Sequence, residues 1–488
     1  MNDSRVITGV KGLDEILNGG LVKERAYLVR GGPGTGKTTL GLHFLKKGIE
    51  ENEKSLLITL TESKQKIKKD AKKRKLDLKK VEFIDLSPGS ELIKNNEEYN
   101  VFPTNQVEEK PLIDSIIDKI KEIKPDRIFF DGIIQLKYLT NDNFKFRKKL
   151  LSFIQFSLDQ ESTLLLSSES NRNIADDDLQ FLVDGVINLN FNSRRRTISI
   201  SKFRGSDFIK GEHTYKLNKQ GLIIFPKLQP PTIKSDIEFN FCSSGLKQID
   251  NLLHGGIEKG TVSVITGPSG VGKTTLGSQF IKNAIKNDKK AILYTFEESK
   301  EFLIKRANSI NISLEEGEEN GNLIIKDIDP SKCIPDEFAQ KVREQVEDNE
   351  VEMIMIDSIT SYRLAYQYST SNNEIIKSLH TLAHYLKKRG ITLILTNEQK
   401  KLTGSFKITD NNISHLADNI VFLRYIERQG SLIKVIGVLK KRLSGFENTL
   451  REFKITSNGL KVGEPLNDLR NILNGTPELL DNTHRGAN

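Results

Sequence analysis

The sequence predicts two tandem α/β domains, each a mainly parallel β-sheet flanked by helices. A chain of 488 residues is too long for a single hydrophobic core. Residues 9–50 and 245–286 repeat one another without a gap, and short apolar runs alternate with helical segments in both halves. The repeat period far exceeds the roughly 20–50 residues of a solenoid, so it indicates a duplicated domain.

The predicted strands follow the same order in both halves. A short apolar strand leads into a glycine-rich loop and an amphipathic helix, a second strand follows, and a third strand ends in aspartate. Alternating patterns late in each half predict antiparallel strands at a sheet edge. The predicted strands are 27–30, 56–60, 127–131, 163–168 and 197–203 in the first half, and 262–266, 291–296, 353–357, 392–396 and 433–439 in the second.

Proline placement and composition set the expected domain boundaries. Three prolines within 226–238 discourage both helix and sheet, which predicts a linker. We therefore expect an N-terminal domain over 1–230 and a C-terminal domain over 239–463. The polar segment 464–488 is expected to form a short helix at 466–473 followed by a mobile tail.

Composition excludes several classes of protein. The chain has only two cysteines, which rules out a disulfide scaffold or a cysteine-rich zinc site. No apolar run of about 18 residues predicts a membrane span, and the first residues lack the layout of a secretory signal, so we expect a cytoplasmic protein. The net charge of +9 is concentrated at 64–80, where the lysines fit a solvated helix face. Without tryptophan for base stacking, a nucleic-acid partner is not expected.

Glycine-rich loops after the first strand of each half match the phosphate-binding pattern GxxxxGK[ST]. Residues 31–38 read GGPGTGKT and residues 267–274 read GPSGVGKT, and we call them the phosphate loops. Their backbone N–H groups surround phosphate oxygens, the lysine reaches the β- and γ-phosphates, and the final threonine ligates Mg²⁺. The sequence therefore predicts two Mg-ATP sites. The candidate nucleotide-binding residues are Gly32, Gly34, Thr35, Gly36, Lys37, Thr38, Thr39, Ser269, Gly270, Val271, Gly272, Lys273, Thr274 and Thr275.

An aspartate at the end of the third strand is the candidate metal ligand in each half. Asp131 ends RIFFD and Asp357 ends MIMID. A carboxylate here can hold Mg²⁺ together with Thr38 or Thr274. An aspartate that closes a strand is also a common turn residue, but its place behind a phosphate loop favours metal binding.

Glutamates after the second strand are the candidates for the base that activates water. The second half has Glu297 and Glu298 in TFEES. In the first half Glu62 is present, but Thr61 occupies the first of the two positions. A threonine hydroxyl cannot accept a proton at neutral pH, so hydrolysis in the first half is in question.

Two cations stand two residues apart late in each half. They are Lys202 and Arg204 in the first basic pair, and Lys440 and Arg442 in the second. Residues i and i+2 of a strand share a face, where two cations repel unless an anion meets them. They are either exposed charges of an edge strand or groups that complete a neighbouring subunit's ATP site.

These features together resemble KaiC and the KaiC-like ATPases of bacteria and archaea over nearly the whole chain. The matching segments are TGVKGLDEILNGGL, both phosphate loops, TFEES, KFRGS and GEHTYKLNKQGLIIFP at 211–226. The resemblance implies RecA-like domains, a homo-hexamer with ATP between subunits, and a KaiB-like or other signalling partner protein. It also implies that both basic pairs reach the neighbour's nucleotide.

The resemblance further implies autokinase activity in the second half. Ser414 stands at the serine of the family's adjacent Ser-Thr pair, whereas His415 replaces the threonine. Thr409 matches another family threonine. Ser414 and Thr409 are therefore the candidate phospho-acceptors, and a two-site phosphorylation cycle is in doubt.

The leading hypothesis is an ATPase whose hydrolysis drives conformational signalling in a hexamer, with serine autophosphorylation in the C-terminal domain. One alternative is a DNA-stimulated ATPase like RecA or RadA, although no separate DNA-binding module is recognised in the sequence. Another is a non-catalytic ATP-sensing scaffold. The Glu297-Glu298 pair argues against a scaffold for the second half, whereas Thr61 permits it for the first.

Overall fold

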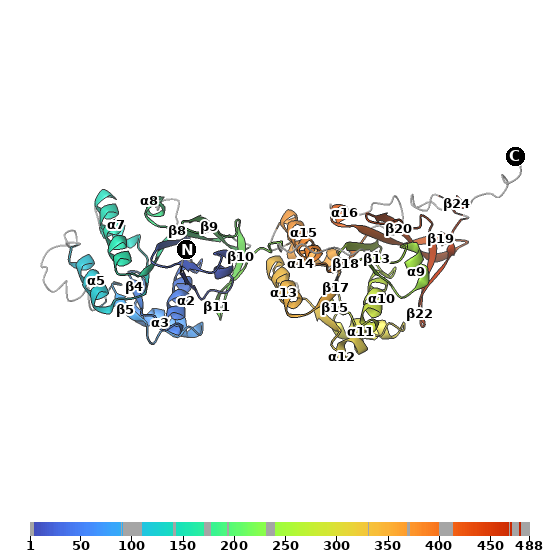
Figure 1. The fold of residues 1–488 in the computed structure, drawn as a ribbon, viewed down its shortest axis with the longest axis horizontal. Coiled ribbons are helices and arrows are strands. Elements are labelled where there is room, and N and C mark those ends of the chain that lie inside the picture. Colours follow the sequence, from blue (N-terminus) through green and yellow to red (C-terminus); the bar gives the residue numbers. More distant parts are fainter. Residues whose placement is uncertain are drawn as a thin grey trace, which may run out of the picture. The chain divides into compact units, whose positions relative to one another are not determined.

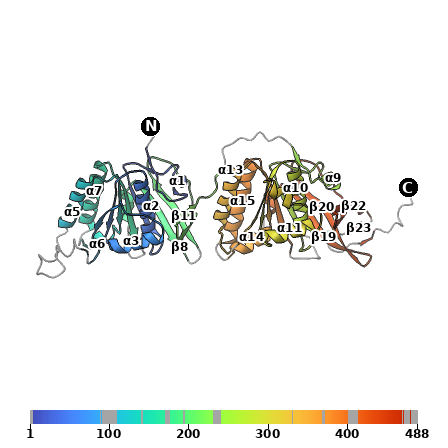
Figure 2. The same ribbon diagram turned by 90° about the horizontal axis from the view of Figure 1, so that it is seen from below.

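The computed structural model divides the chain into two compact units, Met1–Lys227 and Leu228–Asn488. Among the described residues each unit is built around a nine-stranded sheet (Figures 1 and 2). The predicted pair of tandem α/β domains is thereby confirmed. The structure describes residues 4–88, 90, 110–139, 143–169, 177–192, 195–230, 240–329, 331–367, 371–399, 413–467, 469–470 and 478–479.

The first sheet is parallel except at one edge. Its strands are β3 Ala26–Gly31, β4 Ser55–Thr59, β5 Glu82–Asp85, β6 Arg127–Asp131, β7 Thr163–Glu169, β8 Gly185–Phe191, β9 Arg196–Phe203, β10 His213–Asn218 and β11 Gly221–Phe225. The strand order is β11-β10-β9-β8-β3-β7-β6-β4-β5. Strands β8 to β5 pair in parallel, and β9, β10 and β11 extend the sheet in antiparallel fashion, as predicted.

The second sheet repeats this topology. Its strands are β14 Val262–Gly267, β15 Lys290–Thr295, β16 Leu323–Asp327, β17 Val351–Asp357, β18 Thr392–Glu398, β19 Asn419–Arg428, β20 Ser431–Lys441, β21 Arg451–Thr456 and β22 Gly459–Pro465. The order is β16-β15-β17-β18-β14-β19-β20-β21-β22, with β20, β21 and β22 antiparallel. Two-stranded ribbons accompany the sheets: β1 Arg5–Val6 with β2 Leu21–Val22, and β12 Phe241–Cys242 with β13 Ile257–Glu258.

Helices cover both faces of each sheet (Figure 2). The first unit contains α1 Leu13–Ile16, α2 Lys37–Glu50, α3 Lys64–Lys73, α5 Lys110–Ile123, α6 Gln135–Leu139, α7 Asn143–Asp159 and α8 Asp177–Leu182. The second contains α9 Lys247–Leu252, α10 Lys273–Lys286, α11 Lys300–Asn308, α12 Glu315–Glu319, α13 Pro335–Asp348, α14 Ile359–Tyr366, α15 Asn372–Lys388 and α16 Ile413–Leu416. Within the described part of the chain, no helix combines the length and apolar character needed to cross a bilayer.

Alternate residues of the central strands contribute side chains to two hydrophobic cores on opposite sides of each sheet. In β3, Tyr27 and Val29 join the core formed with α2, whereas Ala26 and Leu28 join the core formed with α5 and α7. Because both faces are buried, the strand reads as a continuous apolar run.

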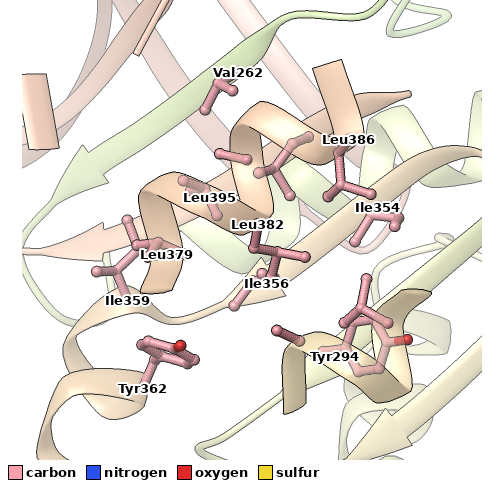
Figure 3. Close-up of a cluster of buried hydrophobic side chains, with 14 of the residues drawn as sticks. Val262, Tyr294, Ile354, Ile356, Ile359, Tyr362, Leu379, Leu382, Leu386 and Leu395 are labelled. Carbon is pink, nitrogen blue, oxygen red and sulfur yellow. The ribbon is translucent and has the colours of Figure 1, made fainter. Parts of the chain in front are cut away.

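Figure 3 shows one core of the second unit. Val262 and Leu395 come from the sheet, Leu382 and Leu386 from α15, and Tyr362 from α14. All five are buried. Such packing on both sides holds the ends of β14 and β17 in fixed positions, and these ends carry the candidate site.

Two expectations about individual segments have different outcomes. On α3, Lys64 and Lys68 are exposed while Ile67 and Ala71 are buried, which confirms a solvated lysine face.

The helix expected at 466–473 is wrong, because Leu469–Arg470 forms β23, an antiparallel partner of β24 Glu478–Leu479. The backbone hydrogen bonds of these residues are made between strands. Residues 231–238 of the expected linker, and 474–477 and 480–488 of the expected tail, lie outside the described residues.

Candidate nucleotide-binding sites

Each phosphate loop joins the carboxyl end of a central strand to the first residue of a helix. Gly34 and Gly36 have φ angles of 70° and 102°, and Gly270 and Gly272 have angles of 73° and 115°. These left-handed conformations favour glycine and turn the peptide N–H groups toward one space. The helices begin at the loop lysines, so each helix N-terminus faces the same space.

The loop lysines are held against their own loops. Lys37 Nζ donates to the carbonyls of Gly31 at 2.8 Å and Gly32 at 3.1 Å. Lys273 Nζ donates to Pro268 O at 2.8 Å. Burial lowers the pKa of both lysines. The two ammonium groups therefore lie where a phosphate chain would enter the loop.

A threonine hydroxyl and an aspartate meet behind each loop. Thr38 Oγ1 donates to Asp131 Oδ2 at 2.8 Å, and Thr274 Oγ1 donates to Asp357 Oδ2 at 2.8 Å. Both aspartates are almost fully buried, and burial raises their pKa values. The structure thus brings together the two predicted metal-binding residues of each half.

This donor set fits Mg²⁺, which proteins usually bind through one or two carboxylates plus water and substrate phosphates. No group of three or more histidine, cysteine, aspartate or glutamate side chains that could enclose a metal is found in the described ranges. The Thr-Asp pairs would therefore hold Mg²⁺ only together with phosphate oxygens. That geometry suits a nucleotide site.

A second hydroxyl donates a hydrogen bond to each aspartate, and sequence reasoning did not find this residue. Ser167 Oγ donates to Asp131 Oδ1 at 2.5 Å, and Thr396 Oγ1 makes the same contact to Asp357. Both residues lie on the neighbouring strand, β7 or β18. A hydroxyl at the fifth position of both predicted strands, TLLLS and TLILT, was the available signal.

Glu297 lies beside the second Thr-Asp pair. Its Oε1 accepts hydrogen bonds from Ser358 Oγ at 2.5 Å and from Ser361 Oγ at 2.8 Å. Ser358 directly follows Asp357, and Ser361 is in the first turn of α14. Neutral donors thus orient the carboxylate that sequence analysis singled out as a base.

The other two candidate glutamates are engaged with cations. Glu298 Oε1 accepts from Arg306 of α11. Glu62 Oε1 accepts from Lys66 of α3 at 2.6 Å. Both glutamates lie on the same kind of turn, but their side chains are held by the helix that follows it.

The first unit lacks the whole arrangement around Glu297. The sequence alone had shown only that Thr61 stands at the position of Glu297. Gly132 follows Asp131 and has a φ of 85°. A Cβ added there would lie 2.7 Å from Thr61 Cγ2, so threonine and glycine pack together where the second unit has a carboxylate and a serine. The trio Thr61, Gly132 and Gln135 replaces Glu297, Ser358 and Ser361.

The first basic pair lies far from its own phosphate loop. Lys202 Nζ donates to Gln180 O at 2.8 Å, and Arg204 NH1 lies 4.0 Å from Asp184 Oδ1. Asp184 Oδ2 accepts from the backbone N–H of Ala26 at 3.2 Å, at the amino end of β3. The loop starts at the other end of β3, about 17 Å away at 3.3 Å per residue.

The second basic pair has the same placement. Lys440 Nζ donates to Ala417 O at 2.6 Å, and Arg442 NH1 lies 3.5 Å from Asp418 Oδ1. Asp418 Oδ2 accepts from the N–H of Val262, the first residue of β14. One detail of the prediction is corrected: both arginines follow the last residue of their strand, so each pair spans a strand end.

The two candidate phospho-acceptors are described to different extents. Ser414 belongs to the short helix α16. Thr409 lies outside the described residues. His415, next to Ser414, accepts from Arg442 NH2 at 3.4 Å through its backbone carbonyl. The backbone that carries Ser414 is therefore in contact with the second basic pair.

Each phosphate loop also contacts a cation that sequence reasoning missed. Arg196 NH1 donates to Gly34 O at 2.7 Å, and its guanidinium lies 3.9 Å from the centre of the Phe191 ring. Lys434 Nζ donates to Gly270 O at 3.1 Å. Arg196 lies on β9 and Lys434 on β20. No local sequence pattern specifies the register of these strands in the sheet, so these contacts could not be predicted.

Comparison with known proteins agrees with this geometry. The family model of the KaiC ATPase matches residues 6–229 and 242–467. The circadian clock oscillator protein KaiC of Synechococcus elongatus is 29% identical over 491 residues, covering 97% of this chain and 92% of that protein. KaiC of Nostoc sp. is 29% identical over 493 residues, with 97% and 92% covered. The circadian clock protein KaiC3 of Synechocystis sp. is 27% identical over 489 residues, with 96% and 94% covered. The chain belongs to the KaiC family of ATPases.

Proposed function

We propose that the chain binds Mg-ATP in both units and hydrolyses it mainly in the second. The observation that carries this proposal is the position of Glu297 beside the Thr274-Asp357 pair. Lys273 would bind the β- and γ-phosphates, and Thr274 and Asp357 would hold Mg²⁺. Bound Mg²⁺ supplies positive charge that neutralises the phosphate oxygens. Glu297 takes a proton from the attacking water.

The first unit has the binding groups without an equivalent base. Lys37, Thr38 and Asp131 repeat the contacts of the second unit. Glu62 is held by Lys66 on the surface. We therefore assign the first unit to nucleotide binding with little hydrolysis, which makes it a sensor of ATP rather than the main consumer.

We propose that each site is completed by the basic pair of a neighbouring copy in a homo-hexameric ring. Arg204 and Arg442 sit at the amino ends of β3 and β14, so they cannot reach their own phosphate loops. A cation that approaches the nucleotide from a second subunit stabilises charge on the transferred phosphoryl group. Hydrolysis would then change subunit contacts and pass a signal to a KaiB-like or other partner protein.

We extend the proposal to phosphoryl transfer onto Ser414. The backbone beside Ser414 contacts both members of the second basic pair, at His415 O and Ala417 O. If Arg442 meets the neighbour's phosphates, this segment lies at the same subunit face. Transfer requires a base within hydrogen-bond reach of the serine hydroxyl, and the neighbour's Glu297 would supply it.

The two alternatives have features against them. A DNA-stimulated ATPase would need a binding surface, and the exposed lysines of α3 form a helix face of the kind that is usually solvated. A non-catalytic scaffold would not need Glu297 oriented by two hydroxyls next to Asp357. A stimulation of ATP turnover by DNA would favour the first alternative, and an absence of turnover would favour the second.

Quantifying the nucleotide released by acid from the purified full chain tests the binding part of this proposal. We expect two nucleotides per chain in the wild type and one in Lys37→Ala or Lys273→Ala, because each lysine serves one loop. A single nucleotide in the wild type would show that one unit does not bind, and the proposal would then be wrong for that unit.

A further inference from the structure

The turn that carries Glu297 and Glu298 is built alike in both units. Thr295 Oγ1 donates to Glu298 O at 3.1 Å, and Thr59 Oγ1 donates to Glu62 O at 2.8 Å. A difference between the units is the cation that holds the second glutamate. In the first unit Lys66 is four residues after Glu62, and 60% of its side chain is exposed.

In the second unit that cation comes from farther along the helix, and 40% of its side chain is exposed. Arg306 is in the last turn of α11, eight residues after Glu298, and its NH2 donates to Glu298 Oε1. Its Nε is buried and has no hydrogen-bond partner among the described residues. Arg306 lines a small hollow together with Thr275 and Ser278 of α10, the helix that follows the phosphate loop. The guanidinium thus lies between the loop helix and the turn of Glu297.

The charges around Glu298 explain why a cation is needed there. Burial raises the pKa of Glu298, and the negative charges of Asp357 and Glu297 act in the same direction, whereas Arg306 lowers it. On the same helix, Lys300 is paired with Glu318 at 2.8 Å. Arg306 therefore offsets the repulsion between neighbouring carboxylates.

We propose that Arg306 is a positioning residue of the second ATP site, which by holding Glu298 fixes the turn and so keeps Glu297 in contact with Ser358 and Ser361. This inference rests on the proposed role of Glu297 as the base. Glu298 then has a different role from Glu297: it is an anchor bound to a cation, while its neighbour remains available to accept a proton. The first unit has Asp70 at the position of Arg306, paired outward with Lys73. The unit that has the base therefore holds this glutamate through an arginine near the end of the helix, whereas the first unit uses Lys66 in the first turn.

Steady-state ATP hydrolysis by the full chain tests this inference. Arg306→Gln should lower kcat roughly 10- to 100-fold, the range expected when a reacting group is displaced by about 1 Å, and leave KM for ATP unchanged. Arg306→Lys should restore most of kcat, because a single cationic donor can replace a single contact. Lys305→Gln removes the same charge from an exposed neighbouring position of α11 and should not change kcat.

A double variant separates positioning from a general effect on the fold. If Arg306 acts through Glu298, Arg306→Gln should lower kcat by less than about twofold when Glu298→Gln is already present. Additive losses, a lowered melting temperature without rescue by lysine, or an unchanged kcat in Arg306→Gln would each overturn the inference. Glu297→Gln is measured in parallel. If it loses turnover while Arg306→Gln does not, the inference about Arg306 fails but the proposed function of Glu297 is still supported.

Discussion

Glu297 Oε1 accepts a hydrogen bond from Ser361 Oγ at 2.8 Å, so the end of β15 and the first turn of α14 meet at one carboxylate. Ser358 makes a second contact to the same oxygen. In the first unit the equivalents of these three residues are Thr61, Gln135 and Gly132. Two units with the same fold and the same phosphate loop therefore differ in the groups that would act on water.

Glu62→Gln tests the assignment of the first unit. We expect ATP turnover to fall by less than about twofold, because Glu62 is held by Lys66 and does not serve as the general base. Turnover of the full chain, measured as phosphate release, checks this. A loss as large as that of a buried catalytic base would show that the first unit carries substantial hydrolysis.

Mixing two inactive variants tests whether sites are shared between subunits. Arg442→Ala alone should lower turnover roughly 1,000-fold, the effect of removing an arginine that contacts the transferred phosphoryl group. When it is mixed with Glu297→Gln chains, some interfaces combine an intact Glu297 with an intact Arg442, and activity should return. The control mixes Arg442→Ala chains with chains that carry both Arg204→Ala and Arg442→Ala. No second-unit interface in that mixture has an intact Arg442. If mixing restores nothing, the shared site is refuted.

Asp357→Asn should stabilise the nucleotide-free protein while abolishing binding that depends on Mg²⁺. Burial raises the folded-state pKa of Asp357 above its ordinary 3.8, so its ionised form opposes folding at neutral pH. As the pH falls through the folded pKa this cost disappears. We expect a gain of about 1 kcal/mol in the free energy of unfolding at neutral pH and a smaller gain in acidic buffer. Denaturant unfolding at several pH values checks this, and a gain that does not change with pH would contradict it.

Radiolabelled ATP tests phosphoryl transfer to Ser414. The wild type and Thr409→Ala should incorporate label, whereas Ser414→Ala should not. His415 beside the acceptor would pair, when protonated, with a phosphate of about −1.5 to −2 charge. Equal labelling of the wild type and Ser414→Ala would exclude Ser414 as the acceptor.

Much of the site could be predicted because its residues are fixed by local pattern and by the repeat. Asp131 and Asp357 each close an apolar strand behind a glycine-rich loop, and parallel strands place their carboxyl ends together. The pairing of Glu298 with Arg306 could not be predicted, because it depends on how α11 turns back over the strand end. The same holds for Arg196, which reaches Gly34 across the sheet from β9. The helix expected at 466–473 failed because strand pairing outweighed a weak local preference.

The central claim is that the second unit carries most of the hydrolysis through Glu297, and phosphate release by full-length Glu297→Gln tests it most directly. We predict a loss of turnover of at least about 100-fold, the contribution expected of a general base, with two nucleotides still bound per chain. Turnover that stays within about twofold of the wild type would contradict the claim, since a neutral amide cannot accept the proton of the attacking water.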